Sequence, residues 1–320
     1  PLPISRAHQW AVLELGMNHA GELTELTKLV KPDVALLTAI APAHYGNFAS
    51  LRGITKAKFE LFSSLPNGAP IVLNSDDTEL TEYGSEIGVD EKFEVFRFGK
   101  QDGCACRLVG IHIDLEAGMK VELELFGEKF SCETRLLGEH NARNIAAAVL
   151  GARLLRPELT TEQIIAGVKR SVAPPMRMES ERLTTGRLLI NDAYNANPGS
   201  MRAAIDLLSR YVADGKSATL IAADMYELGD HSADLHEEVG KYAAEAGIES
   251  LIAVGEFAQN LIRGFQSGGG ARYFEAPNPV AAAAILAKIE FDVVLLKGSR
   301  AMTLEKALDS IRHNEAVRSV

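Results

Sequence analysis

The sequence has 320 residues, of which 47% are hydrophobic and 24% are charged, and its formal net charge is −10 at pH 7. This length is enough for two domains with sizeable cores. The acidic balance, without a dense patch of lysine and arginine, argues against a nucleic-acid partner held through its phosphates.

The compartment is indicated by the apolar runs and the cysteines. The longest apolar runs, such as 34–43 and 145–152, are far too short to span a bilayer, and no signal peptide is visible. The three cysteines Cys104, Cys106 and Cys132 lack the spacing of metal ligands. We therefore expect a cytoplasmic protein in a reducing setting, with no membrane insertion.

The first quarter of the chain alternates between apolar runs and amphipathic stretches. The apolar runs at 10–15, 34–41 and 71–74 predict parallel strands, and the stretches at 22–30 and 54–62 predict helices. This β-α-β-α-β order is typical of a doubly wound parallel sheet.

The pattern changes in the middle of the chain. Four short alternating runs between 93 and 136, separated by glycines, predict an antiparallel meander. Helices are expected at 141–155 and 161–168. The segment Ala173-Pro174-Pro175 is typical of a linker, so we expect one domain at 1–175 and another at 176–320.

A second α/β unit is expected after this linker. Strands are predicted at 188–190, 218–223, 250–254 and 293–296, with helices between them and a last helix from about 303 to 312. No Gly-x-Gly-x-x-Gly opens the unit, although its order of elements is Rossmann-like. The predicted fold class is therefore α/β in both domains.

Three polar side chains follow predicted elements of the first sheet, at the edge where parallel sheets bind ligands. Glu14 ends the first apolar run, His44 follows the second, and Lys58 lies in the next helix. A carboxylate and an imidazole on one rim can hold Mg²⁺ beside a phosphate. For Glu14 we favour the metal over a solvated strand end, whereas His44 or Lys58 alone would be an ordinary loop or surface residue.

The segment Asp214-Gly215-Lys216-Ser217 is similar to the end of a Walker A loop, but we exclude that interpretation. The motif requires a glycine where Arg210 stands, and it lies between a strand and a following helix. Here a helix precedes the segment and a strand follows it. The sequence therefore contains no phosphate-cradling P-loop.

Three other stretches combine polar side chains with strand or helix ends. Asn141 and Asn144 share one face of a helix, where capping alone is the commoner role and a ligand contact is the alternative. In the run from Asp192 to Pro198, a strand passes into a helix, which is compatible with a helix cap or a ligand site. The turn Lys297-Gly298-Ser299-Arg300 suits an anion, with a merely charged turn as the alternative.

The order of these motifs resembles that of the Mur ligase family over nearly all 320 residues. The motifs are Glu-Leu-Gly, Ala-Pro-x-His, Ala-Lys-x-Glu, Gly-x-His-Asn-x-x-Asn, Asp-x-Tyr-Asn-Ala-Asn-Pro and Lys-Gly-Ser-Arg. The Tyr-Asn-Ala-Asn-Pro run resembles the branch that adds D-Ala-D-Ala, and the run from Asp224 to Gly229 with His236 supports this. The resemblance implies a P-loop-type parallel sheet in the central domain with an antiparallel β insertion, followed by a Rossmann-like C-terminal domain.

The resemblance also implies a reaction. ATP would phosphorylate the terminal carboxylate of a UDP-MurNAc-tripeptide, and the amine of D-Ala-D-Ala would attack the acyl phosphate. The cofactors would be ATP and Mg²⁺, since two Mg²⁺ ions can neutralise the charge on the transferred phosphate. The partners would be these two substrates, with no nucleic acid, and we expect a monomer.

Site residues follow from the matched motifs. Glu14 and His44 would be Mg²⁺ ligands, and Lys58 would be the lysine that becomes a metal-binding carbamate. The residues matched to ATP contacts are Asn141, Asn144, Arg177 and Asp192. The residues matched to the substrate side are Tyr194, Asn195, Asn197, Lys297, Ser299 and Arg300.

The sequence departs from the family pattern in three places. Family members usually have Asp-Asp-Ser-Tyr at 191–194 and Leu-Gly-Asp-Met at 222–225, and both changes here keep the charged and aromatic members. The P-loop and the UDP-binding domain that would precede Glu14 are absent. We therefore expect a central domain truncated at its start and inactive alone. The alternatives are another Mur or folylpolyglutamate synthase-like ligase, and a non-catalytic module that binds nucleotide or peptide.

Overall fold

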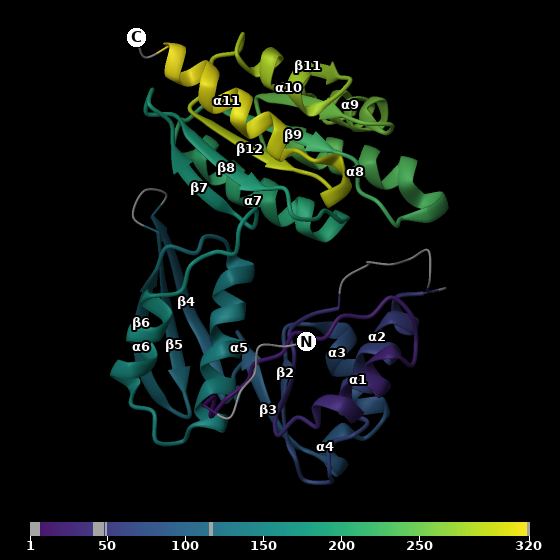
Figure 1. Cartoon of the computed structure of the whole chain (residues 1–320), viewed down its shortest axis with the longest axis vertical. Helices are drawn as coiled ribbons and strands as arrows, with labels where there is room; N and C mark the ends of the chain where they lie inside the picture. Colours follow the sequence, from purple (N-terminus) through teal and green to yellow (C-terminus); the bar gives the residue numbers. More distant parts are fainter. Residues whose placement is uncertain (1–6, 41–47, 49, 115–117, 319–320) are drawn as a thin grey trace.

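The computed structural model describes residues 7–40, 48, 50–114 and 118–318 of the chain. They form two α/β units, one above the other in Figure 1, and each unit contains one six-stranded sheet. The strand order is β1-β2-β3-β4-β5-β6 in the first unit and β11-β10-β9-β12-β8-β7 in the second. Among the described residues, none of the helices has both the length and the apolar character needed to cross a membrane.

The first unit begins with parallel strands and the helices that cover them. The elements are α1 (Glu22–Val30), β1 (Ala35–Leu37), α2 (Leu51–Phe59), η1 (Glu60–Phe62), β2 (Pro70–Asn74), α3 (Thr78–Glu86), α4 (Val89–Lys92) and β3 (Glu94–Gly99). Strands β1, β2 and β3 are parallel. The Ser50 and Asp77 side chains cap the N-termini of α2 and α3, which explains where these helices begin.

The antiparallel part of the same sheet follows. Its elements are β4 (Cys106–Asp114), β5 (Gly118–Leu125), β6 (Glu128–Thr134), α5 (Glu139–Leu155) and α6 (Thr161–Lys169). Alternate residues of β5 are buried, as expected for a sheet with one face on a core. Helices α5 and α6 cover that face, whereas α2, η1 and α3 cover the opposite face of the parallel strands.

Two predicted strands differ from the structure. Residues 10–15 form no strand, and Val12 is 90% exposed, because none of the described strands pairs with this apolar run and a lone strand is not stable. The run at 93–98 becomes β3, which is parallel to both β2 and β4 rather than part of the antiparallel meander. Its alternating pattern reports a half-buried strand and carries no information on the direction of its partners.

The second unit is a doubly wound sheet. Its elements are β7 (Glu179–Arg182), β8 (Leu188–Asp192), α7 (Pro198–Ala213), β9 (Ala218–Ala223), η2 (Gly229–His231), α8 (Ser232–Glu245), β10 (Ser250–Val254), α9 (Ala258–Ser267), β11 (Arg272–Ala276), α10 (Pro279–Leu286), β12 (Val293–Lys297), η3 (Arg300–Met302) and α11 (Glu305–Arg318). The strands β8 to β12 are mutually parallel, and β7 pairs antiparallel at the edge. Every residue of β9 and β12 is buried, because helices cover both faces.

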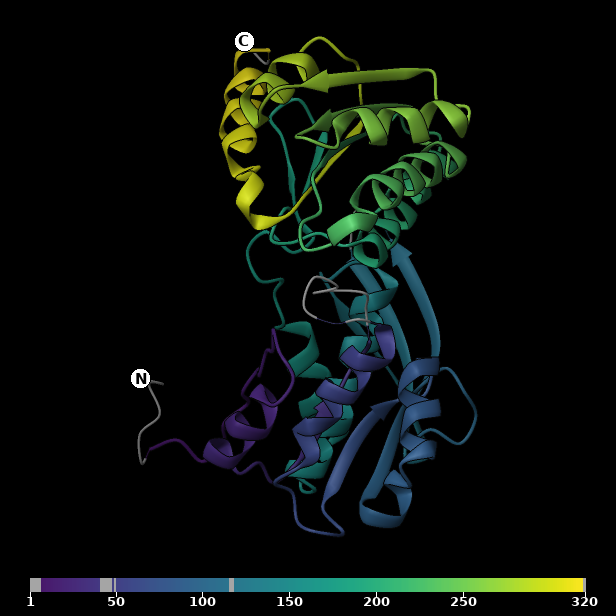
Figure 2. The ribbon, with the colours of Figure 1, turned by 90° about the vertical axis from the view of Figure 1, so that its right-hand side faces the viewer.

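The helices of this unit divide between the two faces of the sheet. Helices α7, α8 and α9 pack on one face, and α10 and α11 pack on the other. Figure 2 shows the two units from the side, with the start of α5 pointing at the second unit. Leu137, which precedes α5, is buried in the core of the second unit. The carboxyl ends of β8, β12 and β9 share one edge of the sheet, which is where such folds bind ligands.

Candidate active site

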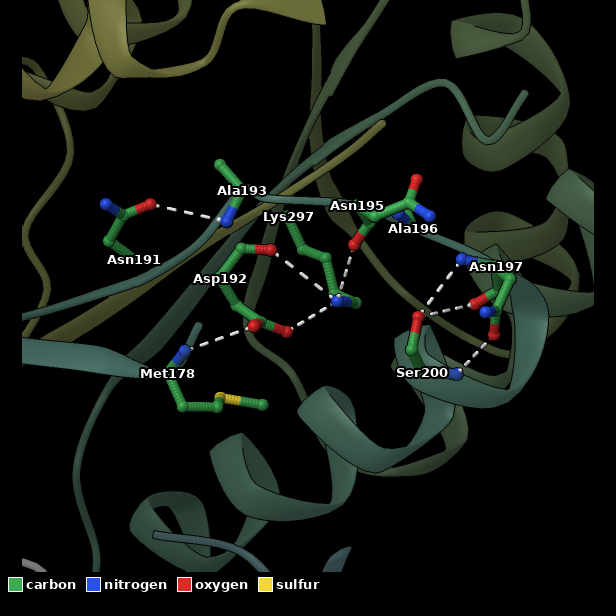
Figure 3. Close-up of polar contacts among 9 residues, drawn as sticks. All are labelled: Met178, Asn191, Asp192, Ala193, Asn195, Ala196, Asn197, Ser200 and Lys297. Carbon is green, nitrogen blue, oxygen red and sulfur yellow. Dashed lines mark hydrogen bonds and ion pairs between the residues drawn. The ribbon is translucent and has the colours of Figure 1, made fainter. Parts of the chain in front are cut away.

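The centre of the site is a buried ion pair between Asp192 and Lys297. These residues end the adjacent strands β8 and β12 and face each other in the strand register. The Lys297 Nζ lies 2.5 Å from Asp192 Oδ2, and only 3% of Lys297 and 8% of Asp192 is exposed. The Met178 N–H donates to the other carboxylate oxygen at 3.1 Å (Figure 3). The charges are thus paired and hydrogen-bonded, as buried charges must be.

Lys297 also holds the turn that follows β8. Besides the carboxylate, its amine donates to the backbone carbonyl oxygens of Asn195 at 3.0 Å and Asp192 at 3.5 Å (Figure 3). An ammonium group has three donors, so these three acceptors satisfy it. Lys297 therefore orients the strand-to-helix turn instead of presenting a free cation at the surface.

The two amides of this turn do different things. The Asn197 side chain accepts from Ser200 N–H at 2.8 Å, and Ser200 Oγ accepts from Asn197 N–H at 3.0 Å, which forms a capping box at the start of α7. The exposed Asn195 accepts from Ala196 N–H at 2.9 Å through its side-chain oxygen and keeps its amide donors. The helix-cap interpretation of the stretch is therefore confirmed for Asn197, whereas a ligand contact of Asn195 stays a prediction.

Arg177 and Tyr194 stack at the same edge. The guanidinium carbon lies 4.1 Å from the centre of the Tyr194 ring, and both residues are exposed. The Tyr194 N–H donates to Met176 O at 3.0 Å, so the segment before β7 is tied to the turn after β8. Met176 and Met178 have φ values of 62° and 52°, an uncommon conformation for non-glycine residues that holds Arg177 between them.

The neighbouring loops after β9 and β12 are joined through Ser299. Its hydroxyl accepts from Tyr226 N–H at 2.8 Å, and its own N–H donates to Asp224 O at 2.9 Å. Ser299 is buried, whereas Arg300 is exposed and pairs with Glu305 at 2.7 Å. The Lys-Gly-Ser-Arg turn therefore places the Ser299 hydroxyl in the protein interior and the Arg300 guanidinium at the surface.

The start of α5 contributes the residues expected to contact ATP. The Asn141 side chain donates to Leu137 O at 2.8 Å, while Asn144 lies exposed one turn later. His140, which the motif contains but to which we assigned no role, interacts electrostatically with Asp192 and Lys297. Burial lowers the pKa of His140, and Asp192 only partly opposes this. Together with the burial of Leu137 in the core of the second unit, these interactions indicate that the start of α5 lies near the edge of the second sheet.

Lys58 lies in a separate group of contacts in the first unit. Its Nζ donates to Ala39 O at 2.9 Å. Burial lowers the pKa of Lys58, with the Asp77 carboxylate acting in the opposite direction. Asp77 also accepts from Ile40 N–H at 2.7 Å and from Leu80 N–H at 3.1 Å. The sequence analysis assigned no role to Asp77, although it follows the predicted strand 71–74, at the edge where parallel sheets place ligand-binding side chains.

The other two expected metal ligands are not placed beside Lys58. Glu14 is exposed in the irregular segment before α1, and His44 lies outside the described residues. Within the described part of the chain, three His, Cys, Asp or Glu side chains do not come together as a metal site. The Mg²⁺ ligands therefore stay predictions.

Comparisons with known proteins match both units. The model of the Mur ligase middle domain matches residues 4–152, and that of the Mur ligase glutamate ligase domain matches residues 176–300. The UDP-N-acetylmuramoyl-tripeptide–D-alanyl-D-alanine ligase of Escherichia coli is 31% identical over 315 residues, which cover 98% of this chain and 67% of that protein. The ligase of the same name from Haemophilus influenzae is 31% identical over 316 residues, which cover 97% of this chain and 66% of that protein.

Solved structures also match nearly the whole chain. The crystal structure of MurF from Acinetobacter baumannii matches with a TM-score of 0.85 at 27% identity, over 97% of this chain and 66% of that one. MurF from Thermotoga maritima in complex with ADP matches with a TM-score of 0.81 at 25% identity, over 93% of this chain and 66% of that one. The chain thus spans about two thirds of the length of the relatives it matches.

Proposed function

Because the chain belongs to the Mur ligase family, we propose that it supplies the ATP-binding and substrate-binding domains of a ligase that joins D-Ala-D-Ala to a UDP-MurNAc-tripeptide. The observation that carries the proposal is the Asp192–Lys297 pair beneath the Tyr-Asn-Ala-Asn-Pro turn, in a chain 31% identical to a ligase of that name. We further propose a domain boundary at residue 175, between the two matched family models.

The proposed reaction makes an unreactive carboxylate into an electrophile. The γ-phosphoryl group of ATP passes to the terminal carboxylate of the tripeptide, which yields ADP and an acyl phosphate. The amine of D-Ala-D-Ala then attacks the carbonyl carbon. A C–N bond forms, the nitrogen loses a proton, and inorganic phosphate leaves with the electron pair of the broken C–O bond. Mg²⁺, when bound, neutralises charge on the phosphate groups.

The residues of the second unit bind and orient the two substrates. The Asp192 carboxylate keeps lone pairs free beside its bonds to Lys297 and Met178, so it can accept from a ribose hydroxyl. The exposed Arg177 guanidinium can pair with phosphate oxygens while it rests on Tyr194. On the peptide side we place the exposed Asn195 and Arg300, with Asn197 and Ser299 shaping the loops beneath them. In the first unit, Asn144 is the amide free to reach the nucleotide.

Three residues would hold Mg²⁺ in the first unit: Glu14, His44 and Lys58 as a carbamate. A carbamate forms when a neutral amine attacks CO₂, a C–N bond forms and a proton is released, which converts a cation into an anion. The lowered pKa of Lys58 increases the neutral fraction of this amine and therefore fits the modification.

The test uses the extended ligase, which we define as this chain preceded by the N-terminal segment of the Escherichia coli relative. We expect phosphate release that requires ATP, UDP-MurNAc-tripeptide and D-Ala-D-Ala together. Nucleotide or peptide binding without turnover would favour the non-catalytic module. Turnover with a single amino acid in place of the dipeptide would favour another Mur or folylpolyglutamate synthase-like ligase.

The 320 residues alone are the matched control. We expect them to have little ligase activity, because this sequence contains no P-loop whose backbone amides and lysine would hold the ATP phosphates. Robust phosphate release by the chain alone would refute this expectation.

A further inference from the structure

The loop that follows β9, residues 224–228, is fixed to its neighbours through Asp224. We call it the rim loop. The Asp224 carboxylate accepts from the N–H groups of Glu256 at 2.8 Å and Phe257 at 3.0 Å, while its backbone carbonyl accepts from Ser299. These contacts join the rim loop to the loops after β10 and β12. Asp224 is only 2% exposed, so its charge is used for this purpose and does not face solvent.

His236, from α8, fixes the next residue of the rim loop. Its Nε2 accepts from Met225 N–H at 2.8 Å, and its Nδ1 lies 2.6 Å from Ser232 O. The two partners define a neutral ring with its proton on Nδ1. The ring is fully buried and stacks on Phe257 with centroids 4.7 Å apart and an angle of 21°. His236 therefore acts on the rim loop and is itself out of reach of a substrate.

The result of these contacts is a fixed and exposed Tyr226. Its N–H is held by Ser299 Oγ, its hydroxyl donates to Met302 Sδ at 3.0 Å, and 44% of the residue is exposed. The next residue, Glu227, has a φ of 65°, an unfavourable conformation for a residue with a side chain. Such strain persists where the surrounding structure over-determines it, and it is concentrated at functional sites.

Tyr226 also lies at the edge of the sheet that carries the Asp192–Lys297 pair. Strands β9 and β12 are adjacent, and Ser299, which holds Tyr226, follows Lys297 by two residues. Lys297 in turn holds the turn that presents Tyr194 and Asn195. The rim loop and that turn therefore flank the Lys-Gly-Ser-Arg turn on its two sides.

We propose that His236 is a positioning residue that fixes the rim loop, so that the Tyr226 ring covers the methyl groups of the D-Ala-D-Ala substrate. This proposal rests on the proposed function. The two methyl groups are the only apolar side chains of the dipeptide, and a half-exposed tyrosine offers an apolar ring with a polar tip. A ring held at both its backbone and its hydroxyl loses little further freedom on binding, which favours affinity.

The first test measures hydrogen exchange of the Met225 and Tyr226 amides in the 320-residue chain. His236→Leu removes the acceptor for Met225 N–H, whereas in His236→Gln the side-chain oxygen can replace Nε2. We expect the Leu variant to exchange these two amides about tenfold faster, as for loss of one hydrogen bond, and the Gln variant to remain near the wild type. Equal protection in all three proteins would overturn the positioning role.

The second test measures steady-state kinetics of the extended ligase. We expect His236→Leu and Tyr226→Ala each to raise the KM for D-Ala-D-Ala about tenfold and to change the KM for ATP less than about twofold. The conservative variants His236→Gln and Tyr226→Phe should retain most of the dipeptide affinity. An unchanged dipeptide KM in Tyr226→Ala would overturn the proposal, and this surface variant decides the matter if His236→Leu does not fold.

The outcomes separate this proposal from the function on which it rests. A wild-type extended ligase without dipeptide-dependent phosphate release overturns the proposed function and the assigned substrate together. A second outcome is that the wild-type extended ligase turns over, but His236→Leu and Tyr226→Ala lower only kcat or raise all KM values equally. This outcome overturns only the role of His236 and Tyr226.

Discussion

At the scale of single residues, Lys297 and Asp192 illustrate how a buried ion pair can be required without being a source of stability. Two charges removed from water recover most of the lost hydration only if each keeps its partner. Here the Lys297 side chain is 4% exposed and that of Asp192 is 11% exposed. Bulk water therefore cannot take the place of either partner when that partner is removed. Removal of one member leaves the other charge buried and unpaired.

This gives a prediction for Lys297→Met. We expect it to lower the free energy of unfolding by about 3–5 kcal/mol, the usual cost of an orphaned buried charge. The double variant Asp192→Asn/Lys297→Met should recover much of this loss, because the amide can still accept from Met178 N–H and carries no charge. Urea unfolding of the three proteins, followed by circular dichroism, measures the difference. A double variant as unstable as the single one would contradict the explanation.

A second prediction concerns Lys58 in the extended ligase. We expect Lys58→Ala to be nearly inactive and to be partly rescued by added short carboxylates, because these can replace the anionic end of a carbamate. The neighbouring Lys56→Ala is the matched control, since Lys56 lies on the exposed side of the same helix. Phosphate release with and without acetate measures both. Wild-type rates in Lys58→Ala would refute the carbamate role.

At the scale of elements, the packing of α8 against α9 depends on two glycines. A Cβ at Gly264 would lie 1.8 Å from Glu237 O, and one at Gly240 would lie 2.0 Å from Leu261 O. The backbones of the two helices are therefore in direct contact. Because the contacting atoms belong to the backbone, they cannot move aside as a flexible side chain can.

We expect Gly264→Ala to lower the free energy of unfolding by at least about 1–3 kcal/mol, the usual cost of overpacking. The matched control is Gly167→Ala in α6, where nothing lies within 4 Å of the added Cβ. That variant should gain about 0.5–1 kcal/mol from higher helix propensity. Urea unfolding gives both values, and opposite signs are the expected result. A stabilising Gly264→Ala would show that the helices separate easily.

The buried ring of α8 predicts how stability depends on pH. Burial lowers the pKa of His236 below its ordinary value of 6.5, so between that folded-state pKa and 6.5 the unfolded chain binds more protons than the folded chain. The free energy of unfolding must then fall as the pH is lowered through this range. The hydrogen bond to the Ser232 carbonyl and, more weakly, the Asp224 carboxylate favour the charged ring, so they only partly oppose this lowering of the pKa.

Unfolding in urea at pH 7.5 and 5.5 tests this dependence. We expect the wild type to lose more stability than His236→Gln between the two values, since glutamine does not titrate and the carboxylates contribute equally to both proteins. An identical loss in the two proteins would mean that His236 titrates in the folded chain as it does in the unfolded one.

The same elements show how far the sequence alone could lead. Strands β9 and β10 and helix α1 were predicted to the residue, because strong apolar runs or a Lys-Pro stop define them. Strands β7 and β11 were not predicted, since exposed edge strands such as Glu-Ser-Glu-Arg carry no apolar signal. The roles of Lys297 and His236 were also out of reach, because a partner more than ten residues away leaves no trace in local spacing.

At the scale of the whole molecule, the two units are joined by one short connection. The α6 helix ends at Lys169, and Ser171, two residues later, still bonds to Gly167 and Val168. The segment from Met176 onward is bonded to the second unit through Asp192 and Tyr194. Between them, Val172 is 80% exposed. Residues 172–175 therefore make up the connection between the units, and the Pro174 carbonyl accepts from Arg177 N–H at 3.2 Å. We expect this connection to act as a hinge for closure over ATP.

The final prediction concerns this hinge in the extended ligase. Two consecutive prolines restrict the backbone, and replacing Pro174 and Pro175 by glycine gives a flexible linker. The domains would then sample more orientations, and the fraction of time spent in the closed arrangement would fall. We expect a several-fold decrease in kcat, a broader size distribution in solution scattering and little change in urea unfolding. The control is the same replacement at Pro66, in a loop of the first unit. A full kcat in the Pro174→Gly/Pro175→Gly variant would place the motion elsewhere, because closure would then not depend on how strongly the connection restrains the two units.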